Sequence, residues 1–207
     1  MLSVDHLVFA TPDLELGIRK VEQLLGVRAT PGGRHPNWGT RNALVALGPE
    51  VYLEIIGPDP DQPGPAGERI FQIDAIDTPR LVTWAVKAAP LSQRVEKAAT
   101  KGIILGEVQS GNRTRPDGSR LSWQLTDPAR VLAAGIIPFL IDWGDSVHPA
   151  QSAVFGGRLV KLYAEHPYPE EVAAILQALN IHLPLRQGAA PALIAIVEQK
   201  GELIEIR

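Results

Sequence analysis

Alternation of apolar and polar residues at the start of the chain predicts a strand over 2–10. Its two faces carry Val4, His6 and Val8 on one side and Leu7 and Phe9 on the other. The apolar spacing then changes to three and four, which is the period of a helix with one buried stripe; the stripe residues are Leu14, Ile18, Val21 and Leu25. Two further strands are predicted over 42–47 and 51–56, joined by a turn. The first 57 residues therefore form a strand–helix–strands unit.

The same order of elements recurs twice. Strands are predicted over 81–87, 106–113, 121–125 and 136–143 with a helix over 91–101, and then over 158–164, 192–197 and 202–206 with a helix after Pro167. The prolines that precede the three helices, Pro12, Pro90 and Pro167, lie 78 and 77 positions apart. Regular spacing of this kind is typical of a repeated unit, although an unrelated α+β protein could show it by chance. We therefore divide the chain into modules over 1–57, 81–144 and 157–207, with a linker over 58–80. Its first part belongs to the Pro/Gly/Asp-rich segment over 57–67, which is expected to be exposed.

Composition narrows the class of protein. The 207 residues carry a net charge of −3, which gives no support for a nucleic-acid partner. No apolar run is long enough for a membrane span, and the first residues do not form a secretion signal. Cysteine is absent, so disulfides and thiolate nucleophiles are excluded. We expect a cytoplasmic globular protein.

Two polar side chains interrupt apolar strands of the first unit. His6 lies in the strand over 2–10, and Glu54 lies in the strand over 51–56 beside Tyr52 and Ile56 on one face. A buried imidazole or carboxylate is costly unless it is paired. An imidazole with carboxylates suits a divalent metal ion. The alternatives are a hydrogen-bonded core histidine and a Glu54 carboxylate paired with Arg41.

Four segments of the chain resemble the vicinal oxygen chelate superfamily, in particular its glyoxalase-like domain proteins. They are VDHLVFATPDLELG, GTRNALVALG, VYLEIIG and PFLIDWGDSVHP. The resemblance implies an α+β fold in which repeated βαβββ modules form curved mixed sheets around a cleft. It also implies a divalent metal ion (Zn, Fe, Mn, Ni or Co) bound by the first and last strands of each module.

Carried over by position, His6 and Glu54 match the ligands of the first module. The positions that match His6 in the other modules are Trp84 and Lys161, which are not usual metal ligands. Glu205 in the last strand is expected as the third metal ligand if the first and third units pair, and Asp142 is the alternative if the first and second units pair. A solvent-facing charge on an edge strand is the other interpretation of Glu205.

Other polar and aromatic residues are placed beside this site by the sequence. The expected substrate pocket contains Trp38, Arg41, Asn42, Asp142 and Trp143. Asp142 could instead accept hydrogen bonds from the backbone of the turn that follows it.

Two loop features have a functional and a plain interpretation. His148 is a candidate catalytic residue with Glu54, as a general base or loop ligand, or else a surface histidine with no role. Arg113 and Arg115 could grip a carboxylate or could mark a solvated hairpin tip.

These features predict a small-molecule metalloenzyme with lyase, isomerase or dioxygenase chemistry on an oxygenated substrate. A homodimer is compatible with the prediction. The alternative is a metal-free ligand-binding protein in which Lys161 neutralises Glu54 or Glu205. The sequence contains no GxSxG, P-loop, GxGxxG or HExxH motif, so serine hydrolases, nucleotide-binding enzymes and zincins lack support.

Overall fold

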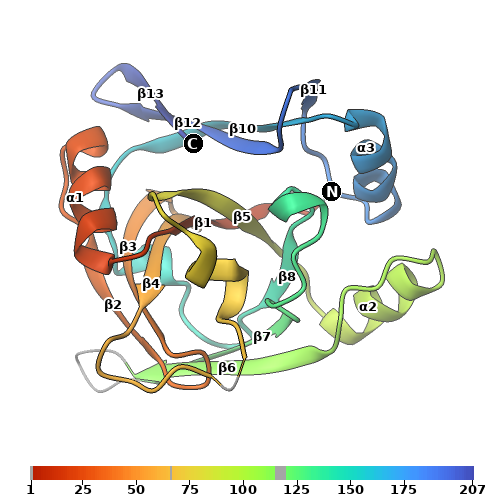
Figure 1. The fold of residues 1–207 in the computed structure, drawn as a ribbon, viewed down its shortest axis with the longest axis horizontal. Coiled ribbons are helices and arrows are strands. Elements are labelled where there is room, and N and C mark those ends of the chain that lie inside the picture. Colours follow the sequence, from red (N-terminus) through yellow and green to blue (C-terminus); the bar gives the residue numbers. More distant parts are fainter. Residues whose placement is uncertain (1, 66, 115–119) are drawn as a thin grey trace.

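A computed structural model of the chain describes residues 2–65, 67–114 and 120–207, and it is a mixed α+β structure (Figure 1). A large curved sheet has the strand order β2-β3-β4-β1-β5-β8-β7-β6, and β9 joins it beside β3. Strands β2 and β6 at its two ends approach each other, so the sheet nearly closes around a cavity. The predicted fold class is confirmed.

The first unit contains one helix and four strands: β1 (Val4–Ala10), α1 (Leu14–Leu25), β2 (Thr30–His35), β3 (Thr40–Gly48) and β4 (Val51–Pro58). Helix α1 begins where the Asp13 side chain accepts a hydrogen bond from the Leu16 backbone N–H at 2.8 Å. It ends at Gly26, which adopts the left-handed conformation with φ 65°. All four residues of the predicted apolar stripe are buried on its inner face. Strand β2 was not predicted, because prolines and glycines in 31–36 indicated only a turn.

The linker and second unit follow in the order η1 (Ile70–Ala75), β5 (Arg80–Lys87), α2 (Leu91–Ala99), β6 (Val108–Thr114), β7 (Arg120–Thr126), η2 (Ala133–Gly135), β8 (Phe139–Asp142), η3 (Pro149–Gln151) and β9 (Val154–Phe155). The part of the linker that follows the Pro/Gly/Asp-rich segment is buried at Ile70, Phe71, Ile73 and Ile76. These side chains pack against the concave side of the large sheet, and Phe71 reaches the cavity. The linker therefore forms part of the cavity wall.

The last part of the chain forms a separate four-stranded sheet: β10 (Arg158–His166), α3 (Pro169–Ala178), β11 (Leu185–Gln187), β12 (Ala192–Gln199) and β13 (Glu202–Ile206). Its strand order is β11-β10-β12-β13. In the first unit the last strand, β4, lies parallel and next to the first strand, β1. In this sheet the last strand, β13, pairs with β12 at an edge and is not next to β10. The third unit repeats the order of elements but not the pairing of the first unit.

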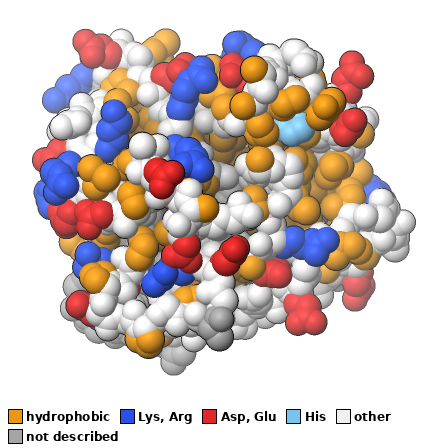
Figure 2. All heavy atoms as spheres, viewed as in Figure 1, with side chains coloured by type: hydrophobic (Ala, Val, Ile, Leu, Met, Phe, Trp, Pro, Cys, Tyr) orange, Lys and Arg blue, Asp and Glu red, His pale blue; other side chains and the backbone are white. Residues whose placement is uncertain are grey.

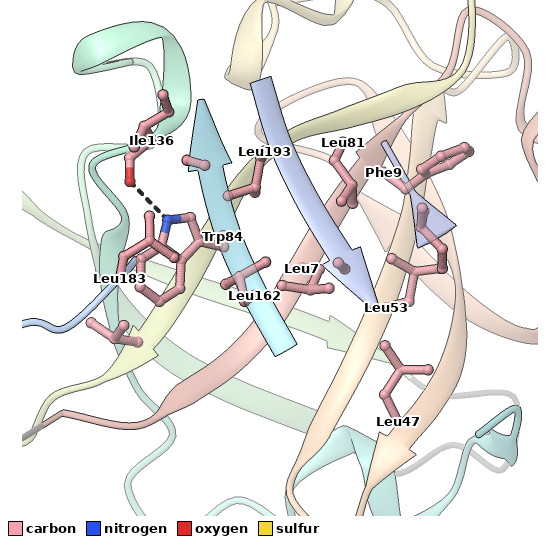
Figure 3. Packing of buried hydrophobic residues seen from close by; sticks show 14 of the residues in the cluster. Leu7, Phe9, Leu47, Leu53, Leu81, Trp84, Ile136, Leu162, Leu183 and Leu193 are labelled. Carbon is pink, nitrogen blue, oxygen red and sulfur yellow. Dashed lines mark hydrogen bonds between the residues drawn. The ribbon is translucent and has the colours of Figure 1, made fainter. Parts of the chain in front are cut away.

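The main core lies between the convex side of the large sheet and the small sheet, which crosses over it in Figure 1. Figure 3 shows Leu7, Leu53 and Leu81 of the large sheet facing Leu162 and Leu193 of the small sheet. The small sheet covers the convex face of the large sheet, as a layer of helices does in many α+β proteins, and buries it. The polar side chains of β1 and β4 point to the concave side.

One buried aromatic residue ties the second unit to this core. Trp84 of β5 donates from its indole N–H to the carbonyl oxygen of Ile136 at 2.8 Å (Figure 3). The residue that matched His6 in the sequence is therefore a core residue, as its side chain points to the convex face with Leu7.

The outer surface is mixed. Figure 2 shows acidic and basic side chains interspersed over the face that it presents. None of the helices in the described ranges is long and apolar enough to cross a membrane.

Candidate functional site

A narrow cavity lies on the concave side of the large sheet, between the two units. Its walls are formed by β1, β3 and β4 on one side and by β6, β7 and β8 on the other, with the linker residue Phe71 between them. The space open to the centre of a water molecule is about 30 Å³. One water needs roughly 10–15 Å³ on that scale, so the cavity in this form admits two or three waters or a very small group.

His6 points into this cavity with a fixed ring orientation. Its Nδ1 atom lies 2.7 Å from the Oδ1 atom of Asp5, and both side chains are buried. A carboxylate can only accept, so Nδ1 carries the proton and donates to Asp5. The ring also stacks on Tyr52, with centroids 4.6 Å apart and an angle of 18°. In the neutral ring Nε2 is then the lone-pair nitrogen, and it faces the cavity.

Asp5 reaches this position because β1 contains an irregularity. Val4 is opposite Val86 of β5, whereas His6 is opposite Ala85, so Asp5 is an extra residue on β1. A bulge of this kind breaks the alternation of faces. Neighbouring residues of a regular strand point to opposite faces, but here Asp5 and His6 meet.

Asp5 accepts hydrogen bonds from two further donors. Nε2 of His148 lies 3.2 Å from its Oδ2 atom, and Nε1 of Trp143 lies 3.0 Å from the same oxygen. His148 accepts the Ala150 backbone N–H at its Nδ1 atom, so its Nε2 atom carries a proton and donates to Asp5. Burial by itself raises the pKa of the Asp5 carboxyl, but the hydrogen bonds from His148 and His6 outweigh burial and hold this pKa well below its usual range. Asp5 is therefore a buried carboxylate.

Glu54 is the second acid–base group at the cavity. Because β1 and β4 are parallel with His6 opposite Tyr52, Glu54 lies two residues further along on the same face. Its Oε2 atom is 3.8 Å from Nε2 of His6. The Nδ2 atom of Asn42 donates to Oε1 of Glu54 at 2.5 Å. The partner of Glu54 is therefore Asn42 and not Arg41.

The Asn42 side chain is fixed by further polar contacts besides the one with Glu54. Its Oδ1 atom accepts the Gly33 backbone N–H at 2.9 Å, and its Nδ2 atom also approaches Nε2 of His35 at 3.4 Å. His35 in turn contacts the Thr40 hydroxyl through Nδ1 at 3.0 Å. Burial lowers the pKa of His35 to about 4; the Glu54 charge acts in the opposite direction and the Arg113 charge lowers it further. His35 is therefore neutral at pH 7, and its Nε2 atom accepts from Asn42.

Three of the residues expected to line the pocket do so: Trp38, Asn42 and Trp143. Arg41 does not, because it points to the opposite face of β3 from Asn42 and lines a separate outer groove beside the start of α1. Asp142 also lies outside this cavity. Its carboxylate accepts the Gly144 backbone N–H at 2.9 Å, which is the turn interaction that the sequence allowed as the alternative.

Glu205 is not brought to His6 and Glu54. It lies on β13 at the edge of the small sheet, is exposed, and accepts from Arg207 at 2.6 Å. The sequence match between 202–206 and 51–56 was misleading because the last strand of the third unit pairs differently. Lys161 is also far from its expected role, since its Nζ atom lies over the Tyr163 ring on the small sheet, 5.1 Å from the ring centroid.

His148 is neither a cavity residue nor a surface residue. It is buried, and it caps η3 through the Ala150 N–H while supporting Asp5. Within the described residues it does not line the cavity, so it is not placed to act as a general base on a bound molecule.

Sequence reasoning gave no functional role to Asp5 or Trp123. Regular alternation would put Asp5 on the face opposite His6, and no sequence signal marks the bulge. Trp123 lines the cavity, with Gly111 against its ring, where a Cβ atom would lie 2.3 Å from Cε2. Arg113 also lines the cavity and is buried, whereas Arg115 falls outside the described residues.

The second unit contributes mainly apolar side chains. On β5 and β8 the residues that face the cavity side include Ala85, Phe139 and Ile141. In the parts of the chain that the structure describes, no group of three or more His, Asp or Glu side chains is placed to hold a metal ion. The polar half of the site comes from the first unit.

Comparison with known proteins gives the family. The sequence profile of the glyoxalase-like domain family matches residues 4–180. Curated protein sequences gave no match. A hypothetical protein from Staphylococcus aureus has a similar structure, with a TM-score of 0.71 and 11% identity over 100% of this chain and 99% of that chain.

Methylmalonyl-CoA epimerases also resemble part of the chain. The enzyme from Mycobacterium tuberculosis has a TM-score of 0.44 and 19% identity over 68% of this chain and 87% of its own. A Streptomyces coelicolor epimerase in complex with 2-nitronate-propionyl-CoA has a TM-score of 0.44 and 18% identity over 68% and 97%. Because the family profile covers most of the sequence, and the curved sheet is that of the superfamily, the chain belongs to the glyoxalase-like domain family of the vicinal oxygen chelate superfamily.

Proposed function

We propose that the protein is an enzyme that moves a proton at a carbon next to a carbonyl group of a small substrate, as isomerases, epimerases and some lyases do. The observation that carries this proposal is the Asp5–His6 pair, which directs a lone-pair imidazole nitrogen into the cavity, 3.8 Å from the Glu54 carboxylate. Buried proton-transfer groups that are held in place by a neighbouring carboxylate are typical of general acid–base catalysis.

The chemistry follows from the placement of the two groups. Nε2 of His6 takes the proton from the carbon, the electron pair of the broken C–H bond forms an enolate, and the imidazolium is stabilised by Asp5 at 2.7 Å. Glu54 lies on the same wall and exchanges a proton with the neighbouring carbon or oxygen. Return of a proton completes an isomerisation with no net change in atoms. The aromatic walls leave little room for water once a substrate fills the cavity.

A resident divalent metal fits the donor set poorly. His6 and Glu54 supply two ligands, whereas metal sites in proteins commonly use three or four side chains. The third ligand expected from the sequence, Glu205, lies on the other sheet, and the described residues around the cavity supply no replacement. We therefore derive no step through a metal and propose no dioxygenase reaction.

Hydrogen–deuterium exchange tests the proposal without knowledge of the product. The protein is incubated in D2O with a panel of small carbonyl and hydroxy compounds, and proton NMR follows the loss of the C–H signal. We expect exchange for at least one member, reduced about 100-fold or more in His6→Gln and Glu54→Gln. Asp77→Asn, which changes an exposed acid, is the matched control. Equal exchange rates in wild type and His6→Gln would show that the assignment is wrong.

The same assay examines the metal separately. After dialysis against a chelator we expect the rate to be unchanged, and adding Zn²⁺ or Mn²⁺ should not restore His6→Gln. Metal-dependent exchange would return His6 and Glu54 to the role of ligands.

The second candidate is a metal-free binding protein, which the apolar wall from the second unit favours. Saturable binding of a panel member with no exchange in wild type would support this candidate over the enzyme.

A further inference from the structure

We propose that Arg113 is the anion-binding residue of the cavity and that the substrate is a small carbonyl compound that carries a carboxylate. The inference rests on the proposed function and names its substrate class.

Arg113 is a cation placed deep in the protein. It lies on β6 with 5% of its surface exposed, and it lines both the inner cavity and the outer groove beside α1. Most arginine side chains keep the guanidinium group in water, because a buried charge is costly. Arg113 therefore lies where the lining of the cavity meets the lining of the groove.

A gap in the opposite strand accommodates this position. Strand β2 has a register shift between Pro31 and Arg34, and Gly32 lies within it. A Cβ atom at Gly32 would lie 2.8 Å from Nη1 of Arg113 and 2.0 Å from Oδ1 of Asn42. Real Cβ contacts are not that short, so only glycine leaves room for both polar groups at this point.

The other charges at the site are acidic. Asp5 lies behind His6, and Glu54 faces the cavity, so among the described lining residues Arg113 is the cation that can attract a bound carboxylate. The Arg113 charge also acts within the site, since it contributes to the lowered pKa of His35. With its carboxylate at Arg113, a small substrate presents the rest of its carbon skeleton to His6 and Glu54.

The shape of the cavity favours a carboxylate over a phosphate. Its walls are flat rings, including Trp38, Trp123 and Trp143, and its free volume is about 30 Å³. A planar guanidinium fork binds a planar carboxylate through two parallel hydrogen bonds. A phosphate group is tetrahedral and not flat, so it packs less well between flat rings than a carboxylate group does.

Tryptophan fluorescence measures binding directly, because three of the four tryptophans line the cavity. The probes are pyruvate, its uncharged isostere pyruvamide, and inorganic phosphate. We expect wild type to bind pyruvate at least 10-fold more tightly than pyruvamide. Arg113→Gln should weaken pyruvate binding by about 10- to 100-fold and remove the preference, with little change for pyruvamide. Arg19→Gln removes an exposed arginine and should keep the preference.

Arg113→Lys guards against loss of folding in Arg113→Gln, as judged by circular dichroism. Lysine keeps the charge but lacks the fork, so the preference for pyruvate should fall without disappearing. Four results overturn the inference: a preference that survives in Arg113→Gln, no preference in wild type, tighter binding of phosphate than of pyruvate, or no saturable binding of pyruvate.

The exchange assay separates this inference from the proposed function. An Arg113-dependent preference without exchange in wild type would refute the proposed function and leave the anion site in place. Exchange that is equally fast for acid and amide and indifferent to Arg113→Gln would refute the anion site alone.

Discussion

Replacing Asp5 with asparagine should move the proton of the neutral His6 ring from Nδ1 to Nε2. In the wild-type site Asp5 accepts from Nδ1 of His6 at 2.7 Å through one oxygen and from His148 and Trp143 through the other. Asparagine has a single acceptor oxygen and one NH2 group. His148 and Trp143 both donate to the position of the Asp5 Oδ2 atom. The amide oxygen of the new asparagine is therefore expected at this position, and its NH2 group faces His6. Nδ1 must then accept, and Nε2 carries the proton.

The size of the effect can be worked from these contacts. All three hydrogen bonds lose the assistance of a charge, which is worth about 1 kcal/mol for each bond. A buried charge is itself unfavourable, so its removal offsets part of the stability that the weaker hydrogen bonds lose. We therefore expect the free energy of unfolding to fall by about 1–3 kcal/mol. The proposed exchange activity should fall about 10²- to 10⁴-fold, because a protonated Nε2 atom cannot accept a proton from the substrate.

Nitrogen-15 NMR of the histidine rings measures the tautomer without a substrate. At alkaline pH, where the imidazole is neutral, we expect Nδ1 of His6 to be protonated in wild type and Nε2 to be protonated in Asp5→Asn. His148 is an internal control, because the Ala150 N–H fixes its Nδ1 atom as an acceptor in both proteins. Asp77→Asn is the matched control for loss of an acidic side chain.

The tautomer separates a positioning role for Asp5 from a merely structural one. A general loss of packing would lower stability and leave the His6 proton on Nδ1. If Asp5→Asn retains a protonated Nδ1 atom at His6, the reasoning is refuted whatever happens to the activity.

Three other predictions test the surroundings of the cavity. The pKa of His35 is lowered from 6.5 to about 4, so between these pH values the unfolded chain binds one more proton than the folded protein. The free energy of unfolding should therefore fall by roughly 3 kcal/mol as the pH is lowered from about 6.5 to 4. Urea unfolding of His35→Gln should lack this decline, and an identical pH dependence in both proteins would contradict the prediction. Gly32→Ala places a methyl group against Asn42 and should abolish exchange while Gly67→Ala, where a Cβ atom meets nothing within 4 Å, does not. Trp84→Phe removes the hydrogen bond to the Ile136 carbonyl and should cost about 1–3 kcal/mol in thermal unfolding, and an unchanged melting temperature would speak against a role for this bond.

Local sequence patterns predicted the parts of the fold that depend on local rules. The spacing of apolar residues gave helix α1 with its buried face. Alternation along β1 and β4 placed His6 and Glu54 on one face, and parallel pairing of the two strands brought them together. These parts could be predicted because side chain direction in a regular strand follows residue number.

Two features of the site could not be read in this way. Asp5 meets His6 because of one extra residue in β1, which depends on the pairing with β5 and not on residues 4–6 alone. Glu205 was placed at the site because 202–206 resembles 51–56, but the order of elements does not determine which strands pair. In the small sheet β12 separates β13 from β10, so the last strand never reaches the position that β4 has in the first unit.

The unequal halves of the cavity explain why polar chemistry and shape come from different parts of the chain. The second unit repeats the framework of the first, but Ala85 and Phe139 occupy its cavity face where a symmetric site needs further polar groups. An acid–base pair that works on one wall does not need a partner pair opposite. It needs an opposite wall that excludes water and holds the substrate against it. Arg113 is the polar residue that the second unit contributes among the described cavity residues, and it lies where an anionic end would fix the direction of a small molecule. On the proposed function, the departure from symmetry assigns proton transfer to the first unit and substrate recognition to the second.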